Sequence, residues 1–326
     1  NLTGKLGSLI FIIILARLII PETFGLYNLV FSTIMFFYVF SDLGVNQAII
    51  YFSSKALHKN KAKAKAYINY LFKIKFSLAL ISAIVLIVLA KTISDSYYNK
   101  PIFLALIAGS LYITFTSLQS FYLSVSQSNN NFRTPLIKEI FFQISRIVMI
   151  PAAILYLKKI AFSSSIIIIT IFILLSLISI FSMFLTYFLS MKNLNLDKTK
   201  TRKLSKKEKS QIKKFIFNIV IITSSILLLG NIDKIIIGPF VPPEFVGYYS
   251  AAFGLVNASA FLLVFSDVFF PIFLRIKGKR LKNTFKKSAV ATLMMSVMLF
   301  IFLIVFSNLL VNIIFGPNYT NSVNML

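Results

Sequence analysis

The 326 residues are 58% hydrophobic, and no soluble domain of this size hides so much apolar surface in one core. The sequence holds no cysteine and one histidine, which excludes disulfides, thiolate zinc sites, cysteine nucleophiles and histidine metal clusters. The net charge of +25 lies between apolar runs, so we expect anionic membrane lipids and no nucleic acid as its partners.

Long apolar runs, taken in chain order, predict an all-α polytopic membrane protein. A helix needs ~20 apolar residues to cross the bilayer, and no segment alternates as barrel strands do. We expect nine full spans and the start of a tenth near residue 320, in a chain that lacks a few N-terminal residues and a longer C-terminal part. The nine are 2–20, 25–54, 67–90, 101–127, 135–157, 162–190, 212–237, 247–274 and 286–314.

Lysine and arginine are concentrated in every second loop. The loops after the second, fourth, sixth and eighth spans are basic, and the richest runs from Lys192 to Lys214. Because cytoplasmic loops carry this excess, the pattern predicts a multi-pass protein of the cytoplasmic membrane with its N-terminus in the cytoplasm. Residues 192–211 then form a cytoplasmic linker between a six-helix bundle, 1–191, and an incomplete second bundle, 212–326.

Helix boundaries have local causes near this linker. Ser205 and Glu208 have the spacing of a capping box, which predicts that a helix begins just after Ser205.

Three landmarks recur at almost one offset along the chain. The offset is 222 for the first and third landmarks and 225 for the second. They are Pro21, Glu22, Gly25 and Tyr27 with Pro243, Glu244, Gly247 and Tyr249; Ser41-Asp42 with Ser266-Asp267; and Tyr97 with Tyr319. Six spans separate the copies, so both insert the same way round. The sequence therefore predicts two six-helix bundles in a parallel pseudo-two-fold repeat around a central cleft, an arrangement typical of alternating-access transporters.

The second span carries polar side chains on one face. Asn28, Ser32, Asp42 and Asn46 fall within an arc of ~80° if the span is one straight helix. This stripe indicates either the wall of a polar cavity or polar contacts between helices.

The fifth span contains Glu139, Gln143 and Arg146 on one helical face, with Arg146 near the middle of the membrane. An ionised side chain in hydrocarbon costs ~2.5–3.5 kcal/mol on insertion scales, so it normally faces a cavity or a partner. The group is either a structural intrahelical pair or a cation, Arg146, placed for an anionic head group.

Arg17 and Lys234 lie near the outer ends of equivalent spans. They either extend to the outer interface or clamp a phosphate from both sides of the cleft. In the second case Asp233 and Asp267 would temper the positive charge or carry a coupling ion.

Hydroxyl residues follow the fourth span at helical spacing and favour close helix packing over a site. They are Ser110, Thr114, Ser117 and Ser124. The sequence has no GxxxxGK[ST] phosphate loop, no paired carboxylates outside the apolar runs and no nucleophile with its base. We therefore expect no enzyme and no metal or other cofactor, apart from a coupling H⁺ or Na⁺.

Residues 16–54 resemble the first helical pair of Wzx-type polysaccharide flippases, members of the multidrug/oligosaccharidyl-lipid/polysaccharide exporter superfamily. The resemblance rests on the first copy of the landmarks and on two groups in the second half. These are Arg17, Pro21-Glu22, Phe24-Gly25-Leu26-Tyr27 and Ser41-Asp42-Leu43-Gly44, then Asp233-Lys234 with Gly238, and Phe315-Gly316-Pro317 with Tyr319.

This resemblance implies a V-shaped pair of bundles that moves a lipid-linked oligosaccharide diphosphate across the cytoplasmic membrane for cell-surface polysaccharide biosynthesis. The cationic cavity of the family would here consist of Arg17, Arg146 and Lys234, and polysaccharide assembly proteins would be partners. Three other interpretations stay open: a cation-coupled multidrug exporter of the same superfamily, a membrane glycosyltransferase or polymer ligase, and a non-transporting membrane scaffold.

Overall fold

The computed structural model describes residues 2–57, 59–160, 162–194, 202–260 and 278–326, and in these ranges it contains helices and no strand. The first half comprises α1 (Leu2–Leu18), α2 (Pro21–Phe40), α3 (Val45–Leu57), α4 (Lys61–Lys91), the π-helical η1 (Thr92–Tyr98), α5 (Phe103–Ser128), α6 (Arg133–Lys159) and α7 (Ser164–Leu194). The second half comprises α8 (Lys206–Leu229), α9 (Ile232–Ile237), α10 (Pro243–Ala260), α12 (Gly278–Val305), α13 (Ser307–Ile314) and the 3₁₀ segment η3 (Pro317–Met325). Six of the described helices are long and apolar enough to cross a membrane, which confirms an all-α polytopic fold.

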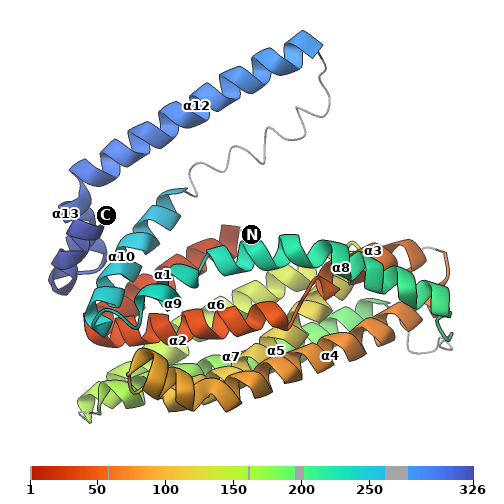
Figure 1. Ribbon diagram of the computed structural model, residues 1–326, viewed down its shortest axis with the longest axis horizontal. Helices are drawn as coiled ribbons and strands as arrows, with labels where there is room; N and C mark the ends of the chain where they lie inside the picture. Colours follow the sequence, from red (N-terminus) through yellow and green to blue (C-terminus); the bar gives the residue numbers. More distant parts are fainter. Residues whose placement is uncertain (1, 58, 161, 195–201, 261–277) are drawn as a thin grey trace.

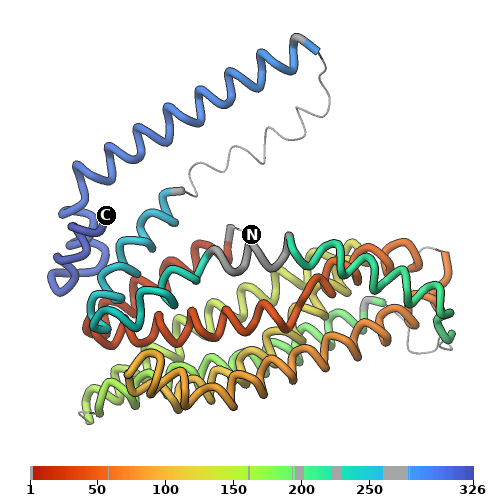
Figure 2. Tube along the Cα trace, in the orientation of Figure 1, coloured from red at the N-terminus to blue at the C-terminus, as the bar shows by residue number. Residues whose placement is uncertain are grey.

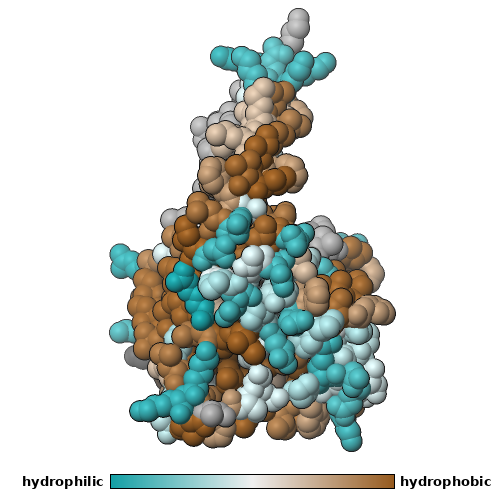
Figure 3. Space-filling model, turned by 90° about the vertical axis from the view of Figure 1, so that its left-hand side faces the viewer, coloured by the Kyte–Doolittle hydropathy of each residue, from teal (hydrophilic) through white to brown (hydrophobic). Residues whose placement is uncertain are grey.

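The two ends of the helical array differ in charge. One end carries the lysine-rich α3–α4 junction and the lysine-rich start of α8, and we term it the basic end. It lies to the right in Figure 1. The α1–α2 and α9–α10 junctions and η1 lie at the other end. Figure 3 looks onto that other end, where hydrophilic residues gather and hydrophobic surface surrounds them. The exposed sides are apolar, as on α4 where Val88 is 70% exposed, so they suit contact with lipid.

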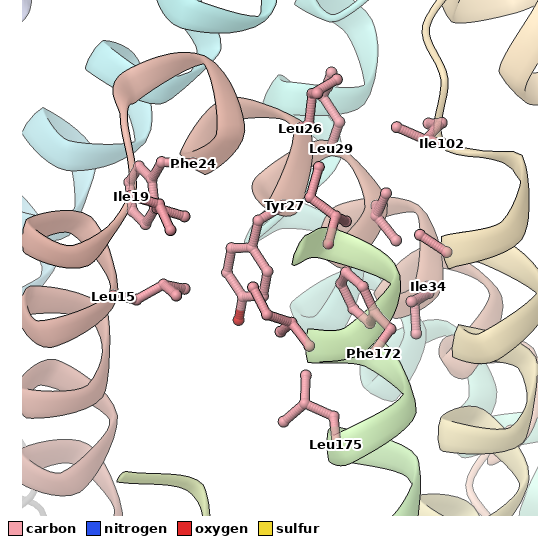
Figure 4. Packing of buried hydrophobic residues seen from close by; sticks show 14 of the residues in the cluster. Leu15, Ile19, Phe24, Leu26, Tyr27, Leu29, Ile34, Ile102, Phe172 and Leu175 are labelled. Carbon is pink, nitrogen blue, oxygen red and sulfur yellow. The ribbon is translucent and has the colours of Figure 1, made fainter. Parts of the chain in front are cut away.

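The main core lies between α1, α2 and α7 of the first bundle. Leu15 of α1 and Phe172 of α7 both lie against α2, whose Tyr27 ring is 5.5 Å from the Phe172 ring (Figure 4). Lipid tails are as apolar as these side chains, so close packing rather than escape from water favours this association.

Hydroxyl groups join α5 to its neighbours. Ser176 of α7 donates a hydrogen bond to the Ala108 carbonyl at 2.8 Å, and the Ser126 and Ser190 hydroxyls are 2.9 Å apart. Ser117 is fully buried and donates to the Ser41 carbonyl at 3.2 Å. The predicted packing role of the α5 hydroxyls is confirmed at Ser117.

The second span is not one straight helix, and this prediction was wrong. α2 ends at Phe40, and the chain turns through Leu43 (φ 43°) and Gly44 (φ 84°) before α3 begins at Val45 (Figure 2). Gly44 suits the left-handed backbone because it has no Cβ. The turn changes the helical phase, so residues before and after it do not share the predicted face. The seventh span is also divided, with α8 ending at Leu229 and α9 beginning at Ile232.

The first repeated landmark forms a reciprocal contact between α2 and α10, which lie side by side at the left of Figures 1 and 2. A Cβ on Gly25 would overlap the carbonyl oxygen of Pro243, and a Cβ on Gly247 would overlap that of Pro21. Each glycine thus packs on the proline that begins the other helix. Two copies of one motif that meet in this way lie around a pseudo-two-fold axis, as the parallel repeat predicts.

The third landmark makes a second reciprocal contact. Tyr97 donates a hydrogen bond to the Ile235 carbonyl of α9 at 3.1 Å, and Tyr319 donates one to the Ile19 carbonyl at 3.3 Å. Tyr97 of the first half thus bonds to α9 of the second half, and Tyr319 of the second half bonds to the residue just after α1 of the first half. The recurrence of both motifs has a physical cause, because each copy holds the other half at the end opposite the basic end.

At the basic end, the predicted capping box is present. The Ser205 amide donates to Glu208 at 2.9 Å and the Glu208 amide donates to the Ser205 hydroxyl at 3.2 Å. Glu208 also forms an ion pair with Lys63 of α4 at 2.8 Å. The Lys63 ammonium is the main reason why the pKa of Glu208 falls from 4.5 to about 2, so this carboxylate is charged at neutral pH. α8 therefore begins inside the predicted linker and is tied to the first half.

Candidate functional site

A cavity of about 1090 Å³ lies between the two halves. Its walls come from α1, α2 and α6 on one side and from the α8–α10 region on the other. Gly4 and Lys5 at the start of α1 and Asn257 near the end of α10 line it, so it extends toward the basic end. The cavity mixes apolar residues such as Phe253 with polar ones, as ligand sites do.

A chain of polar contacts runs along α6 beside this cavity. Arg146 donates to Gln143 Oε1 at 2.6 Å, and Gln143 donates to Glu139 Oε1 at 2.7 Å. The other Glu139 oxygen is 3.2 Å from the Lys138 ammonium. The i, i+4 and i+7 spacing predicted this face, and the structure brings all three residues together. Glu139 lines the cavity itself.

Arg146 also connects α6 to α1. Its guanidinium donates to the Ser8 hydroxyl at 3.2 Å and lies 4.3 Å from the centre of the Phe11 ring. Ser8 lines the cavity, so Arg146 lies directly behind that wall. The buried Nε has no hydrogen-bond partner among the described residues. The guanidinium therefore keeps one donor that a ligand or water can use.

Glycine makes the close approach of α1 and α6 possible. A Cβ on Gly4 would lie 2.7 Å from Glu139 Oε1, and one on Gly7 would lie 2.7 Å from the Gln143 side chain. Gln143 also donates to the Gly4 carbonyl at 3.2 Å. Gly4 and Gly7 thus leave room on α1 for the Glu139 and Gln143 side chains of α6.

Lys234 brings a cation from the second half. It belongs to the short helix α9, is 8% exposed and lines the cavity. Its ammonium lies 5.1 Å from the centre of the Phe253 ring, a cation–π contact, and no described carboxylate lies within ion-pair distance. This cation is available to an anionic ligand.

Asp233 and Asn28 flank this site. Tyr249 donates to Asp233 Oδ2 at 2.6 Å, while Oδ1 is buried with no partner among the described residues. Asn28 lines the cavity and donates its side-chain amide to the Phe24 carbonyl at 2.8 Å. Asn28 thus lies on the wall that the second span was predicted to contribute.

Arg17 lies elsewhere. It is exposed and donates from Nε to the Ile314 carbonyl at 2.9 Å and from Nη2 to the Ile313 carbonyl. These carbonyls end α13, where a helix carries partial negative charge. Arg17 therefore caps a helix of the second half and does not line the cavity with Lys234.

The other three residues of the predicted second-span stripe have their contacts inside the first bundle. Ser32 is fully buried, and its hydroxyl has no partner among the described residues. Asn46 donates to the Ser120 hydroxyl at 3.1 Å. Asp42 is 2.6 Å from Lys75 of α4. None of these three lines the cavity. Asn46 follows the turn at Leu43 and Gly44, which changes the helical face, whereas Ser32 and Asp42 precede this turn and are buried in the first bundle. Asp267 lies outside the described residues.

The sequence interpretation missed Lys75. This side chain has no exposed surface, and its ammonium forms a buried ion pair with Asp42. A lysine within an apolar span is itself a signal, since it requires a partner in the same low-dielectric region. The partner is 33 positions away, in the turn between α2 and α3. Only the fold identifies it.

Two helical bundles that lie around a cavity with both apolar and charged residues in its walls, with apolar outer surfaces, define a multi-pass membrane transporter. The chain belongs to the polysaccharide biosynthesis protein family, whose family model matches residues 1–277. Its fold is similar to the inward-facing conformation of a multidrug resistance MATE family transporter of the MOP superfamily, with a TM-score of 0.66 and 11% identity over 99% of this chain and 75% of that one. At that identity the likeness concerns the fold alone.

A comparison with curated proteins gives no match. The family and the fold together confirm the resemblance to Wzx-type flippases and support a membrane exporter rather than an enzyme.

Proposed function

We propose that this protein moves a lipid-linked oligosaccharide diphosphate across the cytoplasmic membrane by alternating access. The observation that carries the proposal is an inter-bundle cavity that Lys234 lines and whose wall residue Ser8 accepts a hydrogen bond from Arg146. A diphosphate needs cations in a low-dielectric region, where each charge interaction is stronger than in water. The lipid tail would stay in the bilayer between the halves.

We propose that the described state opens toward the basic end. The cavity extends along α1 to the start of that helix, on the side of the basic end, while the α2–α10 crossing and the Tyr97 and Tyr319 bonds hold the halves together at the other end. By the charge rule the basic end faces the cytoplasm, which also puts the N-terminus there. We propose that substrate enters this state from the inner leaflet.

Within this proposal the candidate residues have different roles. Lys234 contacts the diphosphate, and Arg146 supplies its free Nε once the Ser8 wall moves. Asp233 is the candidate for a coupling H⁺ or Na⁺, because one carboxylate oxygen is held by Tyr249 and the other has no described partner. Arg17 belongs to the closed outer end and not to the substrate site.

The test is surface polysaccharide in cells that depend on this protein. Lys234→Ala removes a nearly buried charge from the site, and losing such a contact costs ~2 kcal/mol or more, or about 30-fold in binding. We expect polysaccharide to fall accordingly at unchanged protein level, with partial recovery in Lys234→Arg. The control is Lys286→Ala on α12, an exposed cation away from the cavity. Wild-type polysaccharide in Lys234→Ala would contradict the assignment.

A second candidate is export of an organic cation. Glu139 and the Phe253 ring in the cavity wall are the observations that favour it. It predicts that Glu139→Gln raises drug susceptibility while surface polysaccharide stays normal. If Lys234→Ala instead loses surface polysaccharide while drug susceptibility stays normal, the result supports the flippase proposal and not this second candidate.

A further inference from the structure

A second basic pocket lies outside the cavity, at the seam between α4 and the start of α8. Its volume is about 440 Å³. Its polar lining comes from both halves of the chain, and four of its members are cations. The polar residues are Asn69, Tyr70, Lys73, Arg202, Lys203 and Lys209.

The walls of this pocket are fixed to each other. Glu208 pairs with Lys63 of α4 at 2.8 Å and lies 3.9 Å from Arg202. The Lys209 ammonium lies 5.7 Å from the centre of the Tyr70 ring. Lys73, Lys203 and Lys209 form no ion pair among the described residues. The pocket thus holds four cations in a fixed arrangement. The carboxylate beside it, Glu208, already pairs with Lys63.

The spacing of charges on α4 gives the depth at which we expect the pocket to lie, which is that of the lipid phosphates. Lys73 and Lys91 flank the apolar part of α4, and the 18-residue rise between them is about 27 Å, close to the ~30 Å hydrocarbon core. Below Lys73 toward the membrane centre, Phe76, Leu80 and Ile84 follow at steps of four, and all are exposed. The acyl chains of a lipid whose head group occupies the pocket would therefore lie along an apolar ridge of α4.

We propose that this pocket binds the phosphate of an anionic glycerophospholipid and that the lipid bridges the two halves at the basic end. A phospholipid fits better than the transported substrate, because the pocket faces outward on α4 and does not open into the inter-bundle cavity. Basic pockets between helices on the cytoplasmic side are where such head groups bind. The site is independent of what the cavity transports.

The experiment measures lipid binding to the full chain in detergent by native mass spectrometry, with thermal unfolding alongside. The probes are phosphatidylglycerol, phosphatidylcholine, undecaprenyl phosphate and inorganic phosphate. We expect phosphatidylglycerol to bind best and to raise the midpoint of unfolding, and we expect this effect to weaken with salt.

The variant Lys73→Gln/Lys203→Gln/Lys209→Gln should lose about tenfold or more in phosphatidylglycerol affinity. The matched control, Lys61→Gln/Lys286→Gln/Lys287→Gln, removes the same charge elsewhere and should bind as the wild type. Equal loss in both variants, equal binding of phosphatidylcholine, or preference for undecaprenyl phosphate would each overturn the proposal. The preference of the wild type for phosphatidylglycerol tests it even if the triple variant folds poorly.

Discussion

Charged side chains inside the first bundle and at the cavity are held in different ways. The Lys75 ammonium and the Asp42 carboxylate lie 2.6 Å apart and neutralise each other. The backbone amide of Asn46 also donates to the same Asp42 oxygen at 3.3 Å. Lys234, by contrast, has an aromatic ring and no carboxylate within ion-pair distance among the described residues. A charge with its own partner stabilises structure, whereas one without a partner is available to a ligand.

The buried pair gives a prediction at this scale. Lys75→Met leaves the Asp42 carboxylate uncompensated, and breaking a buried pair from one side costs ~3–5 kcal/mol. We expect that loss in the free energy of unfolding measured in detergent. Asp42→Leu/Lys75→Met should recover much of it, because no buried charge remains. A Lys75→Met protein as stable as the wild type would show that the pair does not form.

Two pairs of helices in this protein approach each other closely at glycines. α1 approaches α6 at Gly4 and Gly7, and α2 approaches α10 at Gly25 and Gly247. In a membrane, association depends on such close backbone contact because the lipid offers no hydrophobic driving force. The α2–α10 crossing differs in kind from the α1–α6 one, since backbone atoms rather than flexible side chains would meet the added Cβ.

This difference predicts the effect of enlarging the glycines. Gly25→Val and Gly247→Val each force backbone apart, and such overpacking costs ~1–3 kcal/mol or more. Both should lower the midpoint of thermal unfolding. Gly254→Val in α10 is the matched control, because nothing lies within 4 Å of its added Cβ. Equal midpoints for Gly247→Val and Gly254→Val would refute the crossing.

At the scale of the molecule, several hydrogen bonds join the halves at the end opposite the basic end, whereas the Lys63–Glu208 ion pair joins them at the basic end. Arg17 donates to the last carbonyls of α13, and Lys100 donates to the Gly238 carbonyl at 2.6 Å, just after α9. Both are cations of the first half on helix C-termini of the second, where they oppose the partial negative charge. The proposed transport cycle requires these bonds to break when the cavity opens to that side.

The chain has no cysteine, so one can be introduced to follow this opening. Asn28→Cys places a thiol in the cavity wall, and an impermeant maleimide added outside intact cells measures access to it. We expect Arg17→Ala/Lys100→Ala to raise its labelling rate about tenfold or more, since even one such charged bond contributes ~1.5–3 kcal/mol. Lys158→Ala/Lys159→Ala is the control. An unchanged rate would mean that these cations do not close the outer end.

Much of the architecture could be predicted because it follows from local properties of the chain. Apolar length fixes the spans, since an unpaired backbone is too costly in lipid. The recurring Pro-Glu and Gly-x-Tyr motif predicted the repeat, and the helical spacing of Glu139, Gln143 and Arg146 predicted their shared face. Each of these inferences involves residues close in sequence or a pattern that recurs.

Only the tertiary structure decided which charged residues meet. Asn28 of α2 lies on the cavity wall, whereas Asp42 lies in the four-residue turn after α2 and pairs with Lys75 inside the bundle, and helical phase cannot be carried across that turn. Arg17 and Lys234 both lie near the outer ends of spans that the sequence predicts to be equivalent, yet one caps a helix and the other lines the cavity. The partner of a buried charge is set by how distant helices pack, and that packing is not written in the spacing of any one segment.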